Sequence, residues 1–156
     1  MKAWIGSGRG ADVSYALHDL PMPGPGPDEL LLRVKAVGVN RVDQYPTGKH
    51  FNHSPAAPAA IPGLEAAGEV MAIGADVQGF RQGERVTAMV QGGCAEFVTV
   101  RAAIAMRIPQ SMSWTAAAAV PVSYLTAHNA LVTLGQLQRG GRLLIHAATT
   151  GVGIAA

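Results

Sequence analysis

Short segments in which apolar and polar residues alternate occupy most of the first 110 residues. Leu32, Val34 and Ala36 alternate with Arg33 and Lys35, and this period of two indicates a strand with one buried face. Similar strand-like segments cover residues 1–5, 13–20, 30–40, 64–74, 85–90, 92–100 and 103–109. Because they are short and separated by turn residues, they predict about six or seven strands of a small barrel or sandwich.

Two proline-rich stretches interrupt these strands. Residues 21–29 contain four prolines and two glycines, and residues 41–63 contain four prolines. Proline and glycine disfavour both helix and regular strand, so both stretches are predicted to be loops. The second loop has room for one helical turn near residues 42–45.

After residue 110 the alternation gives way to helical spacing. Residues 111–121 predict a short helix with Ser113 as its N-cap and Pro121 as its stop. A second helix is predicted by an aliphatic stripe, Val122, Leu125, Leu131 and Leu134. Gly135 is the candidate C-cap of this second helix.

The final segment has the pattern of a strand followed by a glycine turn. Residues 142–148 are apolar without alternation, which is typical of a strand at the centre of a parallel sheet, and His146 is expected to be a hydrogen-bonded core histidine.

The turn TTGVGIAA should open a helix. Its backbone amides could bind a pyrophosphate. The G-x-G-x-x-G spacing falls on Ala148, Thr150 and Gly153, and only Gly153 matches. An ordinary strand–turn–helix connection made of small residues would have the same sequence. Both interpretations, a pyrophosphate-binding turn and a plain connection, therefore stay open.

Composition narrows the classes of function. The net charge is only +2 and aromatic residues make up 5%, which argues against a nucleic-acid binder. The single cysteine, Cys94, excludes an internal disulfide and a four-cysteine zinc site. The N-terminus lacks a secretory signal pattern, and the apolar stretches are shorter than a membrane span. A cytoplasmic protein that binds neither nucleic acid nor membrane is therefore expected.

Five sequence blocks, in order, carry a family resemblance. They are GVNRVDQYPTG, IPGLEAAGEVMAIGADVQGFRQGERV, GGCAEFVTV, IPQSMSWTAAAAVPVSYLTAHNAL and GGRLLIHAATTGVGIAA. Together they resemble the medium-chain dehydrogenase/reductase superfamily, and within it the zinc-independent, zeta-crystallin-like quinone oxidoreductases. The resemblance implies a mostly β fold: a GroES-like barrel over residues 1–121 with two helices. Residues 122–156 would then be a connecting helix and the first strand and glycine turn of an incomplete Rossmann α/β domain.

The same resemblance implies a function. The parent protein would transfer a hydride from NADPH, used in preference to NADH, to a quinone or an α,β-unsaturated carbonyl compound, and would act as a homodimer. The 156 residues by themselves are expected to be a truncated, inactive part of that enzyme. The alternative is a non-catalytic barrel module, or pseudoenzyme fragment, used for binding or oligomerisation.

The resemblance also argues against a catalytic metal. Zinc-dependent members of the superfamily carry a cysteine where this chain has Asn40 and a histidine where it has Leu64. Glu65 alone cannot hold zinc, which needs about three protein ligands. A separate zinc site built from His50, His53 and Cys94 is disfavoured. Without a Lewis acid, reduction of a conjugated carbonyl or a quinone is easier than alcohol oxidation.

The candidate catalytic residues are Asn40 and Tyr45, which by resemblance lie beside the nicotinamide and substrate. The candidate cofactor-binding residues are Asn40, Tyr45, Thr126, Ala148, Thr150, Gly151, Val152 and Gly153. The alternative roles are a turn-capping asparagine for Asn40, a loop aromatic for Tyr45 and a helix-packing threonine for Thr126.

Three further residues have expected structural roles. Asp43 is expected to brace its loop. Glu65 is expected to hold backbone or a basic partner, and Cys94 is expected to be a buried structural thiol.

Overall fold

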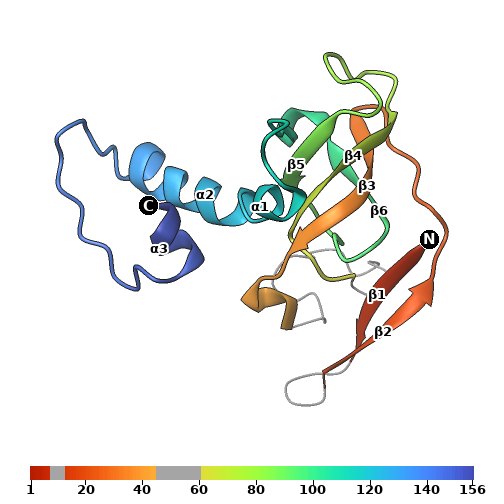
Figure 1. Ribbon diagram of the computed structural model, residues 1–156, viewed down its shortest axis with the longest axis horizontal. Helices are drawn as coiled ribbons and strands as arrows, with labels where there is room; N and C mark the ends of the chain where they lie inside the picture. The colour runs from red at the N-terminus through yellow and green to blue at the C-terminus, as the bar shows by residue number, and fades with distance from the viewer. Residues whose placement is uncertain (8–12, 45–60) are drawn as a thin grey trace.

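The computed structural model describes residues 1–7, 13–44 and 61–156, and its main body is an antiparallel sheet that curves around an apolar core (Figure 1). The strands are β1 (Lys2–Ser7), β2 (Ser14–Asp19), β3 (Glu29–Gly38), β4 (Glu65–Ile73), β5 (Arg85–Met89), β6 (Phe97–Arg101) and β7 (Met106–Arg107). Each strand overlaps a segment in which the alternation predicts one. The mostly β class is therefore confirmed.

The five-stranded sheet has the order β6-β3-β4-β5-β7, and every neighbouring pair is antiparallel. Strand β3 lies between β4 and β6, so Leu32 pairs with Val70 on one side and with Val98 on the other. Two register shifts interrupt the β3–β4 ladder, and irregularities of this kind bend a strand and increase its twist. The sheet can therefore wrap around its core.

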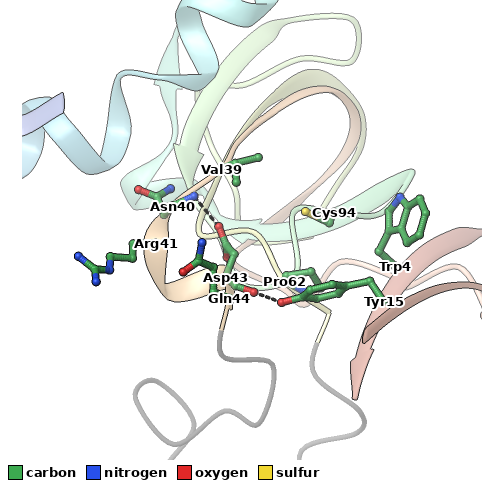
Figure 2. Close-up of a pocket in the computed structure, with 9 residues that line it drawn as sticks. All are labelled: Trp4, Tyr15, Val39, Asn40, Arg41, Asp43, Gln44, Pro62 and Cys94. Atoms are coloured by element: carbon green, nitrogen blue, oxygen red, sulfur yellow. Dashed lines mark hydrogen bonds between the residues drawn. The ribbon is translucent and has the colours of Figure 1, made fainter. Parts of the chain in front are cut away.

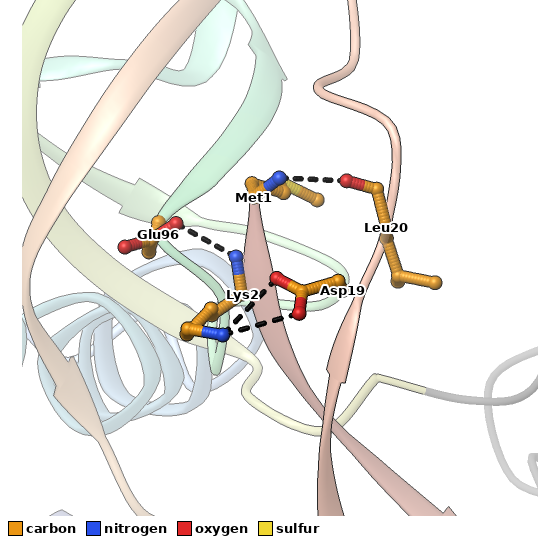
Figure 3. A network of polar contacts seen from close by, with 5 residues as sticks. All are labelled: Met1, Lys2, Asp19, Leu20 and Glu96. Carbon is orange, nitrogen blue, oxygen red and sulfur yellow. Dashed lines mark hydrogen bonds and ion pairs between the residues drawn. The ribbon is translucent and has the colours of Figure 1, made fainter.

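Strands β1 and β2 form a separate hairpin, and β1 is hydrogen-bonded to the segment of residues 94–96 that leads into β6 (Figure 3). The backbone N–H of Lys2 donates to the Glu96 carboxylate at 2.7 Å, and the Lys2 ammonium lies 3.1 Å from Asp19. Ala3 also bridges Ala95. These contacts bring the hairpin, and with it Trp4, to the side of the sheet on which the candidate site lies.

The main core lies inside the curved sheet. Its fully buried members are led by Leu30, Leu32, Val70 and Val86. A smaller cluster, in which Ala67 and Ile108 meet Ala117 and Ala118, joins the sheet to the first helix.

Helical segments connect and follow the strands. They are the 3-10 turns η2 (Arg41–Gln44) and η3 (Ala102–Ile104), the helices α1 (Trp114–Ala118), α2 (Pro121–His128) and α3 (Gly151–Ala155), and the π-helical η4 (Asn129–Leu134). In the described part of the chain, no helix is long and apolar enough to cross a membrane.

The helix boundaries agree with the expected caps and add a role for Pro121. The Ser113 hydroxyl accepts the N–H of Ala116 at 3.1 Å, as an N-cap does, and Gly135 is the C-cap of η4. The first helix ends at Ala118, before Pro121 as expected, but Pro121 is also the first residue of α2, a role that the sequence pattern did not predict for it. Proline is favoured at this position because its missing N–H has no partner there in any helix.

The strand expected over residues 142–148 is wrong. These residues are irregular, His146 is exposed rather than buried, and the Leu144 side chain is 81% exposed. The segment forms a loop that leaves η4 and returns so that α3 lies against α2 (Figure 1). An apolar strand forms only where neighbouring strands take its hydrogen bonds. The described residues supply no such neighbour, so the first strand of a Rossmann domain is absent from this structure.

Two side chains of β5 fasten α1 and the segment before it to the sheet. The Thr87 hydroxyl contacts the carbonyl oxygens of Ala66 at 3.1 Å and Ala117 at 2.8 Å. The Arg85 guanidinium donates to three backbone carbonyls between residues 109 and 112 and stacks 4.2 Å from the centre of the Trp114 ring. Arg85 therefore holds residues 109–112, which lead into α1, against the sheet.

We predict that R85K destabilises the protein by about 1–2 kcal/mol, because a lysine can neither bridge three carbonyls nor stack as a flat guanidinium does. Urea unfolding followed by tryptophan fluorescence and circular dichroism measures this change. R81K is the matched control, since Arg81 is exposed in a turn before the same strand. Equal midpoints for the two variants would contradict the role given to Arg85.

Candidate functional site

The turn after β3 is built around the Asp43 carboxylate. One carboxylate oxygen accepts the N–H of Asn40 at 2.7 Å, and the other accepts the N–H of Gly63 at 2.8 Å. Asp43 thereby closes η2 and ties it to the segment that leads into β4. The expectation that Asp43 braces this loop is confirmed.

Gly63 is required at its place for two reasons. Its φ of +104° lies in the region that favours glycine, and a Cβ there would lie 2.7 Å from the backbone nitrogen of Cys94. The close approach brings Cys94 beside the Asp43 turn.

Glu65, the first residue of β4, is the buried carboxylate of the site, with only 4% of its surface exposed. Its Oε1 accepts the Asn40 Nδ2–H group at 3.0 Å, and its Oε2 accepts the backbone N–H of Val122 at 2.8 Å. Val122 lies in the first turn of α2, so one carboxylate joins the end of β3 to the start of that helix. Of the two partners expected for Glu65, backbone or a basic group, the structure shows backbone, together with a neutral amide.

Gly38 makes room for this carboxylate. A Cβ at Gly38 would lie 2.3 Å from Glu65 Oε1, which is far inside van der Waals contact. The end of β3 and the carboxylate can therefore pack together only because residue 38 has no side chain.

A cleft of about 460 Å³ opens next to the Asp43 turn (Figure 2). Its lining residues are Trp4, Tyr15, Val39, Asn40, Arg41, Asp43, Gln44, Pro62 and Cys94. The side chains of Asn40 and Arg41 extend to one side of the cleft, whereas Trp4 and Tyr15 lie on the other. The Tyr15 hydroxyl donates to the backbone carbonyl of Asp43, which joins the hairpin to the η2 turn.

Two acidic groups in the cleft are kept in their neutral forms. Burial raises the pKa of the Cys94 thiol, and the nearby negative charge of Asp43 raises it further. The pKa of Tyr15 is raised by burial first, and then by Asp43 and Cys94. At neutral pH the cleft therefore presents a thiol and a phenol rather than their anions. Cys94 is half-buried at the cleft wall, whereas a buried structural thiol was expected.

The glycine turn lies against α2 rather than in the cleft. The Thr150 hydroxyl accepts the N–H of Gly153 at 3.1 Å as the N-cap of α3. A Cβ on Gly153 would lie 2.5 Å from the carbonyl oxygen of Ala147, and one on Gly151 would lie 2.7 Å from the Ser123 hydroxyl. Small residues are therefore needed both within the turn and where it meets α2.

The structure brings only part of the predicted site together. Asn40 lines the cleft, and Glu65 connects it to the start of α2, while Thr126 is exposed one turn after Ser123 on the same helix. Thr126 and residues 148–153 are not among the residues that line the cleft. Tyr45 lies outside the described residues, as do His50 and His53.

Trp4 and Tyr15 are cleft residues that the sequence did not single out. They come from the β1–β2 hairpin, whose position depends on contacts with residues 94–96, which are distant in sequence. The alternation of apolar and polar residues places Trp4 and Tyr15 in strands, but it does not predict which segment will pack against those strands.

The donor set around Asn40 does not fit a metal ion. Asn40 and Leu64 provide neither a thiolate nor an imidazole, and both oxygens of Glu65 already accept hydrogen bonds. Among the described residues there is no group of three His, Cys, Asp or Glu side chains that could hold a metal ion.

Comparisons with known proteins agree with this architecture. The family model described as the alcohol dehydrogenase GroES-like domain matches residues 26–110. The quinone oxidoreductase of Lama guanicoe is 35% identical over 149 residues, which are 94% of this chain and 45% of that protein.

Two solved structures are similar over 99% of this chain. The crystal structure of the human synaptic vesicle membrane protein VAT-1 homolog-like protein has a TM-score of 0.85 and 34% identity, with 50% of its chain covered. The quinone oxidoreductase of Thermus thermophilus, solved alone and in complex with NADPH, has a TM-score of 0.78 and 36% identity, with 48% covered.

The chain thus spans about half the length of the proteins that it matches. The matched region contains the antiparallel sheet, the Asp43 turn and Glu65. The chain therefore belongs to the alcohol dehydrogenase GroES-like domain family and, within the medium-chain dehydrogenase/reductase superfamily, to the group of quinone oxidoreductases and VAT-1 homologues.

Proposed function

We propose that these residues form the substrate-side wall of an NADPH-dependent reductase that acts on quinones or α,β-unsaturated carbonyl compounds without zinc. The observation that carries the proposal is the environment of Asn40. Where zinc-dependent members place a ligand cysteine, this chain has an amide that is hydrogen-bonded to a buried carboxylate beside a largely apolar cleft.

This environment favours an activated substrate. A metal-free site cannot polarise a simple alcohol or ketone strongly, because it lacks the positive charge of a Lewis acid. A quinone or an enone already withdraws electrons from the carbon that accepts the hydride. The protein then needs only to position the reactants and to donate hydrogen bonds to the developing oxyanion.

The cofactor proposal rests on α2 and the turn packed against it. When bound, NADPH supplies the hydride. Thr126 and Asn40 would hold the nicotinamide end, and Ala148, Thr150, Gly151, Val152 and Gly153 would hold the pyrophosphate. The small residues that bring this turn against Ser123 support the assignment, as does the NADPH complex of the Thermus thermophilus relative.

The cleft would bind the substrate. Its apolar walls would exclude water from the reacting atoms, and Tyr45 would donate a hydrogen bond to a substrate oxygen. We further propose a boundary between residues 121 and 122, which separates the barrel from the cofactor domain. The parent protein would be a cytoplasmic homodimer acting on small molecules.

The first test is catalytic. In a protein in which these residues are followed by a complete cofactor-binding domain, we expect NADPH oxidation with 1,4-benzoquinone, measured by the loss of NADPH absorbance. Because no metal takes part, 1,10-phenanthroline should leave the rate unchanged, and elemental analysis should find no stoichiometric zinc. The 156 residues alone should give no turnover.

Two outcomes would count against this proposal. Loss of activity on chelation, together with bound zinc, would refute the metal-free mechanism. A folded protein that oxidises NADPH with neither quinones nor enones would instead support a binding module.

A second prediction concerns Cys94, because quinones and enones alkylate thiolates but react slowly with neutral thiols. Since burial and Asp43 raise the Cys94 pKa, less thiolate is present at a given pH in the folded chain than in the unfolded chain. We expect the rate of alkylation by iodoacetamide to rise with a midpoint above the ordinary value of 9.0 in the folded protein.

The same chain unfolded in urea is the control, since Cys94 is its only cysteine. Its midpoint should be lower than that of the folded protein. A folded-state midpoint equal to or below the unfolded one would show that the cleft does not keep the thiol neutral.

A further inference from the structure

The carboxamide of Asn40 has one end that donates hydrogen bonds and one end that accepts them, and the outward end decides what it can bind. Its Nδ2 group donates to Glu65 Oε1 at 3.0 Å and lies 3.4 Å from the carbonyl oxygen of Gly38. Both of these partners are acceptors within the wall of the site. The donor end is therefore turned inward, and the oxygen Oδ1 is the end left to face a ligand.

The surroundings fix this orientation. A carboxylate only accepts hydrogen bonds, and Oε2 of Glu65 is already committed to the N–H of Val122 at 2.8 Å. An Asn40 amide turned by half a rotation would place its oxygen against Glu65 Oε1 and the Gly38 carbonyl. Because only 4% of Glu65 is exposed, water could not relieve that repulsion.

The direction of the side chain adds a second constraint. Figure 2 shows the Asn40 carboxamide extending away from Trp4 and Tyr15, on the opposite side of the cleft. Glu65, to which the carboxamide is bonded, also holds the first turn of α2, the helix that carries Thr126. The acceptor oxygen is therefore associated with the proposed cofactor side rather than with the aromatic side of the cleft.

We propose that Glu65 is a positioning residue that fixes Asn40 as a hydrogen-bond acceptor for a donor group of the nicotinamide nucleotide. This inference rests on the proposed function. The donor is either the carboxamide N–H of the nicotinamide or a ribose hydroxyl. Asn40 cannot in this orientation donate to the developing oxyanion of the substrate, so that hydrogen bond comes from another group.

The orientation can be tested in this chain without any ligand. In a ¹⁵N-labelled sample, the Asn40 side-chain NH₂ signals are identified by their loss in N40D. In E65Q the side chain of residue 65 gains an NH₂ group that can donate to Asn40, so the Asn40 NH₂ group should turn outward. Its NMR signals should then shift, and its protection from hydrogen exchange should fall by about tenfold or more.

E69Q is the matched control for this measurement. Glu69 lies on the same strand and pairs with Lys35 at 3.5 Å, so its substitution removes the same charge without touching Asn40. The Asn40 signals should not change in E69Q. Well-dispersed backbone spectra verify that each variant is folded, and unchanged Asn40 signals in a folded E65Q would overturn the proposal.

Exchanging the amide of residue 40 with the carboxylate of residue 65 tests the link to cofactor binding. In N40D/E65Q, the amide introduced at position 65 can donate to the carboxylate introduced at position 40, while its oxygen still accepts the N–H of Val122. An acceptor then again faces the ligand. In a protein that also has the complete cofactor domain, E65Q should raise the KM for NADPH about tenfold, the equivalent of one lost hydrogen bond, while changing kcat less. N40D keeps an outward acceptor but removes the inward donor and places two carboxylates against each other, so repulsion between them should displace residue 40 and also raise the KM. The double variant should recover most of that loss.

A third comparison identifies the donor. The reduced 3-acetylpyridine analogue of the cofactor has no carboxamide N–H. If that N–H is the donor, E65Q has no effect on the KM for the analogue; if a ribose hydroxyl is the donor, the effect persists.

Failure of this inference and failure of the proposed function give different results. A double variant no better than either single one refutes the positioning role of Glu65. A wild-type protein that does not oxidise NADPH refutes the proposed function, whereas the orientation of Asn40 is decided by the spectra of the chain alone.

Discussion

The buried carboxylate of Glu65 is the constraint on which the arrangement of the site depends. An isolated buried carboxylate costs several kcal/mol, and hydrogen bonds to both of its oxygens are needed to offset that cost. The two donors are the Asn40 amide and the first turn of α2, so the carboxylate holds together two elements that are distant in sequence. Gly38 follows from the same requirement, because any side chain there would occupy the place of the carboxylate.

Asp43 is a second carboxylate that holds two segments together, on the other side of Asn40. Its two oxygens accept backbone N–H groups from Asn40 and Gly63, so the turn after β3 is held to the approach to β4. The negative charge that braces the turn also raises the pKa of Cys94 and Tyr15. The same carboxylate therefore supports the turn and adds to the effect of burial, which is the larger cause of the raised pKa of both groups.

The barrel and the final segment differ in how far they depend on distant residues. Within the barrel, β3 finds both of its neighbours among the described residues, and its leucines become buried. Residues 142–148 have an equally apolar sequence, but they have no neighbouring strand in the described part of the chain and remain irregular and mostly exposed. Periodicity states which face a strand would bury, whereas the hydrogen bonds that make it a strand must come from elsewhere.

The amino-acid sequence was sufficient to locate the strands between residues 2 and 107, the Ser113 cap, the Gly135 cap and the family, because alternation, capping chemistry and motif spacing are local properties. It also singled out Asn40 through the family motif, and the residue types around that position exclude a thiolate or imidazole ligand there. The folded chain was needed to establish that Glu65 turns the Asn40 amide inward and that Trp4 and Tyr15 line the same cleft. Those contacts join residues that are far apart in the chain, and no local pattern encodes which donor will meet which acceptor.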